Sequence, residues 1–230
     1  MLNYHPSVDL LIDYSAGTLD LAHAFCVATH LENCVECQKL VTKLEQIGSS
    51  LFENQTHLVD KSTSLQTLKN RCFERLEEES VPIIPSKKHV NKVDKNAYKV
   101  PVCLQQFVPN TYDDLNWIGL SSSFRFAVLD KDTSGRQVAL TRICAGSSIP
   151  AHSHTGEEVT LVLEGSFSDE NDIYQKGDFI VKNHNHTHKP IISKDAECIC
   201  LVVLDSSIQF TGFFARWFNP LLRKLHPRAI

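Results

Sequence analysis

The apolar residues of this chain change their spacing near residue 85. Before that point they recur every three to four residues, as on one face of a helix. We expect four helices: one that Gly17 ends, one from a Thr18 cap to about Leu31, one after Cys34, and one with its cap at residues 62–64. The residues expected on their buried faces are Val8, Leu11, Ile12, Leu21, Ala22, Phe25, Ala28, Leu40, Val41, Leu44, Ile47, Leu65, Leu68, Cys72 and Leu76. Short helices bury little apolar surface, so we expect a structural metal to stabilise them.

After Tyr98 the apolar residues alternate with polar ones in short runs, which predicts strands. The expected strands are residues 98–108, 117–120, 123–129, 137–145, 159–167, 172–175, 179–181, 189–192 and 197–204. Regularly spaced antiparallel strands predict a jelly-roll barrel. The stretch between the two halves holds prolines and lysines and predicts a linker. We therefore predict an α+β protein of two domains, with helices at residues 1–82, a linker at 83–97 and a barrel at 98–230.

Two histidines and a glutamate at the start of the barrel half predict a metal site. Residues i and i+2 of a strand face the same side, so His152 and His154 both enter the barrel. A short turn then brings Glu158 back on the paired strand. With Gly146 and Gly165, the spacing G-x5-H-x-H-x3-E-x6-G resembles the first motif of cupin barrels at every fixed position.

A further ligand is expected from the histidine-rich stretch at residues 184–188. His188 is the first choice, because it opens the next apolar run. His186 is the alternative, while His184 is expected in a solvated turn. Three histidines and one carboxylate suit zinc, and they also suit iron, manganese, nickel or copper.

A second cluster of metal-binding residue types lies near the N-terminus, in the spacing H-x3-C-x2-C of His30, Cys34 and Cys37. These side chains converge if the helix breaks near Asn33. Thiolates and an imidazole at this spacing favour a tetrahedral structural zinc site, for which His5 is the nearest fourth ligand. The plainer interpretation is two buried thiols and a capping histidine.

Together these segments resemble the ChrR-type anti-sigma factors, in which a zinc-binding helical domain precedes a cupin. The resemblance covers most of the chain. It is carried by His5-Pro6, the runs Asp9–Leu19 and Val27–Cys37, His152 to Glu158, Thr160–Glu170, Gly177–Phe179, His188 to Pro190, and the pair Cys198 and Cys200.

The resemblance implies two metal sites and one protein partner. It implies that His5, His30, Cys34 and Cys37 bind a structural zinc. It also implies that His152, His154, Glu158 and His188 bind a second metal, again zinc. The partner is an extracytoplasmic-function sigma factor, against which the fourth helix packs, and the stress that releases it is reactive oxygen, in particular singlet oxygen.

Composition narrows the function further. The formal net charge of −4 and the lack of a basic stripe argue against direct DNA binding. Neither a signal peptide nor a long apolar run is present, so we expect a soluble, cytoplasmic protein. Eight cysteines without a secretion signal are expected as free thiols. Those expected to be buried in a core are Cys26, Cys72, Cys103 and Cys144. Cys198 and Cys200 are two buried residues of one strand or a redox pair.

Two functions remain in competition. The first is a regulator whose helical domain inhibits a sigma factor and whose cupin senses stress. The second is a cupin metalloenzyme, a dioxygenase, hydrolase or isomerase, with an accessory module. A catalytic cupin needs no zinc-bound helices, so the H-x3-C-x2-C segment favours the regulator. The aromatic C-terminal tail at residues 210–225 is expected to cover a face of the barrel.

Overall fold

The computed structural model describes residues 2–53, 63–78, 98–108, 110–131, 136–183, 187–206, 208–211 and 219. The chain forms two compact units, one of residues 1–47 with 98–230 and one of residues 48–97. The predicted linker at residues 83–97, His184, His186 and nearly all of the C-terminal tail lie outside the described residues. The domain boundaries at 82 and 98 therefore stay a prediction.

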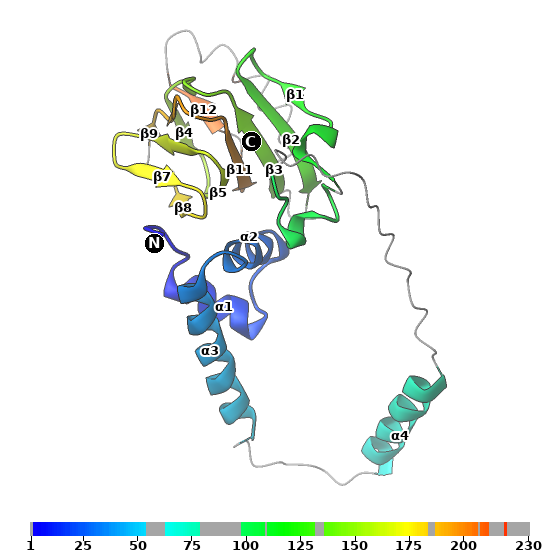
Figure 1. Cartoon of the computed structure of the whole chain (residues 1–230). Helices are drawn as coiled ribbons and strands as arrows, with labels where there is room; N and C mark the ends of the chain where they lie inside the picture. The colour runs from blue at the N-terminus through cyan, green and yellow to red at the C-terminus, as the bar shows by residue number, and fades with distance from the viewer. Residues whose placement is uncertain are drawn as a thin grey trace. The chain divides into compact units, whose positions relative to one another are not determined.

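The four expected helices are present (Figure 1). Their bounds are Val8–Ala16 for α1, Leu21–Leu31 for α2, Val35–Glu53 for α3 and Thr63–Glu78 for α4. Gly17 ends α1 with a φ of 69°, a left-handed conformation that glycine adopts without strain. The cap of α2 is Asp20 rather than Thr18, because the Asp20 carboxylate accepts the His23 N–H at 3.1 Å.

The buried faces of the helices differ from the prediction at several positions. In α2 the side chains of Ala22, Cys26 and Val27 are buried, whereas Leu21 is 73 % exposed. Leu21 is the first residue of the helix. Val41 of α3 is buried, but Ile47, nearer its far end, is exposed.

Within the described residues, the barrel half contains one six-stranded and two three-stranded sheets. The large sheet has the order β1-β2-β3-β11-β5-β8, and the small ones are β10-β6-β7 and β12-β4-β9. The large sheet consists of β1 (Ile118–Gly119), β2 (Phe124–Lys131), β3 (Gln137–Ile143), β11 (Cys198–Leu204), β5 (Glu158–Glu164) and β8 (Phe179–Lys182). The small sheets consist of β10 (Ile191–Ile192), β6 (Ser166–Ser168), β7 (Ile173–Gln175), β12 (Ile208–Phe210), β4 (His152–His154) and β9 (Thr187–His188). All the pairings between these strands are antiparallel, as a cupin-type jelly roll requires.

The expected strand at residues 98–108 is absent from the described residues there, which contain a short 3-10 helix, η1 (Val102–Leu104). Pro101 precedes it and has no N–H to donate to a strand ladder. A second 3-10 helix, η2 (Tyr112–Asp114), follows before β1.

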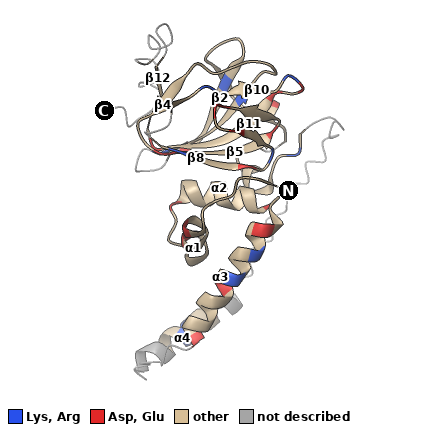
Figure 2. Ribbon diagram, turned by 90° about the vertical axis from the view of Figure 1, so that its left-hand side faces the viewer, with Lys and Arg blue, Asp and Glu red and all other residues tan. Residues whose placement is uncertain are grey.

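The central strand β11 is buried on both faces, which explains its continuous apolar sequence. Ile199, Leu201 and Val203 face a core that also contains Val27 of α2, while Cys200 and Val202 face the interior of the barrel. Both views of the molecule show α2 lying against the outer face of the large sheet (Figures 1 and 2). The N-terminal helices therefore share a core with the barrel.

Candidate metal centres

The N-terminal cluster brings together four side chains from three segments. His5, His30, Cys34 and Cys37 each place one ligand atom so that all lie within 4.8 Å of one another. His5 Nδ1 is 3.3 Å from Cys34 Sγ and 3.4 Å from Cys37 Sγ. The sequence predicted this convergence, and the structure contains it.

The break between α2 and α3 determines where Cys34 and Cys37 lie. Helix α2 ends at Leu31 and α3 begins at Val35, so Cys34 precedes the first turn of α3. There the Cys37 N–H points at Cys34 Sγ, at 3.4 Å. The partial positive charge of a helix N-terminus favours a thiolate at this position.

His30 shows that the cluster fits a metal. Its Nδ1 donates to the carbonyl oxygen of Gly177 at 2.9 Å, which leaves the Nε2 lone pair free. Nε2 is buried and has no hydrogen-bond partner among the described residues. Burial also lowers the pKa of His30, so the ring is neutral at neutral pH. A neutral imidazole with an unsatisfied buried lone pair is what a metal ligand offers.

The two thiols lead to the same conclusion. Burial and the adjacent Cys34 sulfur raise the pKa of Cys37 to about 12, so this thiol does not ionise by itself. A bound cation reverses this, because metal binding displaces thiol protons. Two sulfurs and two imidazole nitrogens match the tetrahedral donor set of structural zinc.

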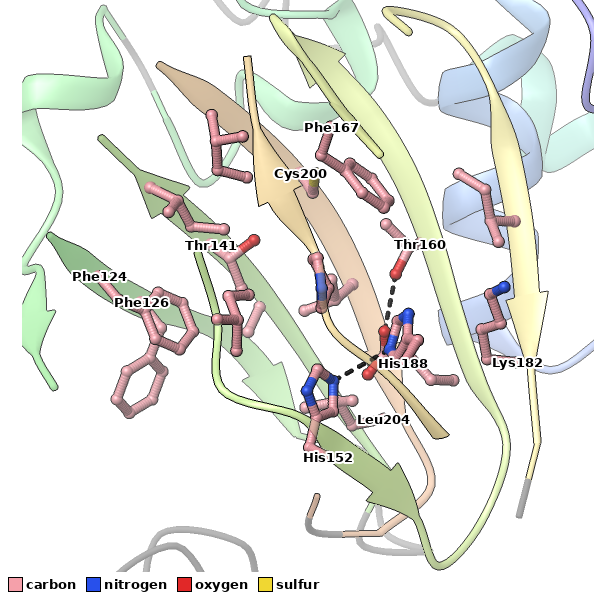
Figure 3. A pocket seen from close by; sticks show the side chains of 18 of the residues that line it. Phe124, Phe126, Thr141, His152, Thr160, Phe167, Lys182, His188, Cys200 and Leu204 are labelled. Atoms are coloured by element: carbon pink, nitrogen blue, oxygen red, sulfur yellow. Dashed lines mark hydrogen bonds between the residues drawn. The ribbon is translucent and has the colours of Figure 1, made fainter. Parts of the chain in front are cut away.

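The barrel cluster is formed by His152, His154 and His188, whose ligand atoms also lie within 4.8 Å of one another. His152 and His154 share one buried face of β4, as their spacing predicted. His188 lies on β9 directly opposite His152 in the strand register. The Nε2 atom of His188 is 3.0 Å from that of His152 (Figure 3). It is 3.1 Å from that of His154.

The Nδ1 atoms of His152 and His188 already have hydrogen-bond partners. Nδ1 of His152 donates to the Pro150 carbonyl at 3.0 Å, and Nδ1 of His188 donates to Asp169 Oδ2 at 3.2 Å. Burial lowers the pKa of His152 to about 4, and it also lowers the pKa of His188. Neutral rings with Nδ1 protonated aim Nε2 lone pairs at one another, which is repulsive unless a cation lies between them.

Glu158 lies beside this cluster and contacts one of its members. Strand β5 begins at Glu158, and Oε2 is 3.3 Å from His154 Nδ1. Oε1 accepts from the Thr160 hydroxyl at 2.9 Å. Burial opposes its ionisation, but the three histidines and Thr160 lower the pKa of Glu158 nonetheless. The expected pairing of its strand with β4 is wrong, because β5 pairs with β11 and β8.

Asp169 is a residue of this site that the sequence did not reveal. Its side chain is fully buried, and Oδ2 contacts both His188 and Lys182, with the Lys182 Nζ at 3.1 Å. Lys182 Nζ also donates to the Tyr174 hydroxyl at 3.2 Å. Burial opposes ionisation, but the Asn171 and Asp172 N–H groups and Lys182 lower the pKa of Asp169 to about 2. The carboxylate thus fixes the orientation and protonation of His188.

A loop of the barrel contacts the N-terminal cluster. The buried Asp178 carboxylate accepts the N–H groups of Asn3 and Tyr4 at 3.0 and 3.2 Å, and Phe179 N–H donates to the Tyr4 carbonyl at 3.0 Å. The neighbouring residue, Gly177, is the acceptor for His30. The loop between β7 and β8 therefore holds both the segment that carries His5 and the ring of His30.

The remaining cysteines are divided between core and surface. Cys198 and Cys200 are buried free thiols with their sulfurs 3.6 Å apart. Cys26 is buried as expected, but Cys72 and Cys144 are exposed, so their assignment to a core was wrong.

The chain is similar to known proteins, both in its barrel half and along nearly its whole length. Residues 105–207 match the family model of the ChrR cupin-like domain. The chain is 31 % identical over 223 residues to the anti-sigma-E factor ChrR of Cereibacter sphaeroides, covering 96 % of this chain and 99 % of that protein.

The chain is also similar to solved structures. The crystal structure of Rhodobacter sphaeroides SigE in complex with the anti-sigma ChrR matches with a TM-score of 0.69 and 29 % identity, covering 89 % of this chain and 99 % of that one. A cupin of Ralstonia eutropha matches with a TM-score of 0.40 and 17 % identity, covering 45 % of this chain and 71 % of that one. Within the described residues, no helix is both long and apolar enough to span a bilayer.

Proposed function

Because this chain belongs to the family of ChrR-type anti-sigma factors, we propose that it binds and inhibits an extracytoplasmic-function sigma factor. The observation that carries this proposal is the 31 % identity to an anti-sigma factor along nearly the whole chain. It acts in the cytoplasm, where a sigma factor would meet RNA polymerase, and as a regulator rather than an enzyme.

Exposed apolar side chains on α3 and α4 support binding to a protein partner. Helix α3 exposes Ile47, Leu51 and Phe52, the last two by 66 % and 71 %. Helix α4 exposes Leu68 and Phe73. Exposed apolar side chains gathered on helices mark interaction sites. Charges of both signs lie along α3, unlike the basic stripe of a DNA-binding helix (Figure 2).

The proposed role of the N-terminal cluster is structural. His5, His30, Cys34 and Cys37 would hold zinc, which supplies a tetrahedral cross-link between the N-terminal segment and the start of α3. This short helical part has few buried residues, so such a cross-link fixes how α3 leaves the barrel.

The proposed role of the barrel cluster is to sense oxidative stress of the singlet-oxygen type. His152, His154, Glu158 and His188 would hold zinc or another divalent metal. The loop at Gly177 and Asp178 supports this role, since it belongs to the barrel and forms hydrogen bonds with the N-terminal segment and with His30. Release requires only that the two states of the protein differ in affinity for the partner.

Co-purification tests the proposal. The full chain is co-expressed with the sigma factor encoded beside it, together with the variants Cys34→Ser and Cys144→Ser. Cys144 is exposed and lies outside both clusters, so it is the matched control. We expect the wild type and Cys144→Ser to retain the sigma factor and Cys34→Ser to lose it. Failure of the wild type to retain the sigma factor would reject the proposal.

A cupin metalloenzyme is the second candidate, favoured by a cavity that reaches His152 and His188. Turnover of an oxygenated substrate by a full chain that does not bind the sigma factor would establish it instead.

A further inference from the structure

The barrel encloses a cavity of about 130 Å³ beside the histidine cluster. Figure 3 shows aromatic and aliphatic side chains from several strands pointing into it. The apolar side chains of its wall are Leu120, Phe124, Phe126, Ala139, Ile143, Ile149, Phe167, Ile180, Pro190, Ile192, Val202 and Leu204. An apolar wall with a few polar groups is the usual form of a small-molecule site.

Four of the lining residues form a row across the large sheet. In the strand register Gln137 lies opposite Leu204, Leu204 opposite Glu158, and Glu158 opposite Lys182. This row crosses four neighbouring strands, and all four residues line the cavity. A molecule in the cavity therefore meets the polar side chains of this row and the hydroxyl groups of Thr141 and Thr160 within a mostly apolar wall.

The side-chain amide of Gln137 is the group in this row that favours a bound ligand. It is only 4 % exposed, and its Nε2 has no hydrogen-bond partner among the described residues. Native proteins rarely leave a buried donor without an acceptor. An acceptor supplied from within the cavity would satisfy this amide.

The apolar wall favours a neutral molecule, because a charged group moved from water into it would lose its hydration without gaining a free partner. The Lys182 ammonium is already paired with the buried Asp169 carboxylate. An anion would thus gain no unpaired cation from the side chains named in this wall.

We infer that the cavity binds a neutral, mostly apolar organic molecule of about six heavy atoms, whose carbonyl-type oxygen accepts a hydrogen bond from Gln137 Nε2. The size follows from comparison with an engineered apolar cavity of about 150 Å³ that binds benzene. This site goes beyond the proposed function, because it requires no sigma factor.

Side-chain amide signals of the ¹⁵N-labelled full chain test the inference. The Gln137 NH₂ pair is identified by its loss in Gln137→Leu. Cyclopentanone has six heavy atoms and one carbonyl, and benzene has six heavy atoms and no such acceptor. We expect cyclopentanone to shift the Gln137 pair saturably, with a dissociation constant in the millimolar range.

Variants separate the hydrogen bond from the cavity. Gln137→Leu, followed through the backbone amide signals of the cavity wall, should weaken cyclopentanone binding about tenfold and leave benzene binding within about twofold, as expected for one lost hydrogen bond. The exposed Gln175→Leu is the matched control and should change neither. Ala139→Leu should fill the cavity and abolish binding of both probes, and Thr141→Leu serves if that variant does not fold.

Absence of any saturable shift at Gln137 would overturn the inference, as would equal cyclopentanone affinity in the wild type and a folded Gln137→Leu. An internal water would then account for the amide. Sigma-factor retention measured on the same samples distinguishes this failure from failure of the anti-sigma proposal.

Discussion

Replacing Asp169 with asparagine tests whether a buried carboxylate prepares His188 to bind a metal. Asp169 Oδ2 lies 3.2 Å from His188 Nδ1 and 3.1 Å from Lys182 Nζ. Asparagine keeps the size of the side chain and removes the charge. Removing such a partner from a metal-binding histidine lowers metal affinity about 10–100-fold.

The same substitution has a predictable cost in stability. The pKa of Asp169 is lowered from 3.8 to about 2, which corresponds to about 2 kcal/mol at neutral pH. Because the folded pKa is the lower one, this stability is fully present above about pH 4 and is lost as the pH falls toward 2. Asp169→Asn should therefore unfold more easily at pH 7 and show a smaller loss between pH 4 and 2.

Two measurements check this prediction against a control. Chelator competition gives the metal affinity of the barrel site, and denaturant unfolding at several pH values gives the stability. Asp195→Asn, at an exposed carboxylate, should match the wild type in both. If Asp169→Asn binds metal at the barrel as tightly as the wild type, the role assigned to this carboxylate is wrong.

Other predictions concern two glycines and the contact of the β7–β8 loop with the N-terminal segment. Gly165→Ala should destabilise the barrel by roughly 3 kcal/mol or more in denaturant unfolding, since φ is 73° and an added Cβ would lie 2.1 Å from the Glu197 carbonyl oxygen. Gly48→Ala meets no atom within 4 Å and should stabilise α3 by up to about 1 kcal/mol; a similar loss in both variants would refute the steric argument. Asp178→Asn should speed hydrogen exchange at the Asn3 and Tyr4 amides, and unchanged protection would show that the carboxylate does not hold this segment.

The sequence predicted those parts of the sites that depend on local spacing. The H-x3-C-x2-C run places three side chains around one helix break, and His152 and His154 share a strand face through simple alternation. The structure brings these residues together, while their binding of metal stays a prediction.

The missed features depend on contacts between distant segments. Asp169 lies between two of the expected strands, and its Oδ1 accepts the Asn171 N–H at 2.9 Å. Its other oxygen reaches His188, 19 residues away, and spacing gives no sign of that contact. Nor does any local pattern show that Tyr4 lies against β8, or that Leu21 is exposed.

Zinc content and sigma-factor affinity, measured together on the wild type, Cys34→Ser and His152→Ala, test the division of roles between the two clusters most directly. The account predicts two metal ions per wild-type chain and one in each variant, with sigma binding lost only in Cys34→Ser. Wild-type sigma affinity in a Cys34→Ser chain that has lost its N-terminal zinc would contradict it.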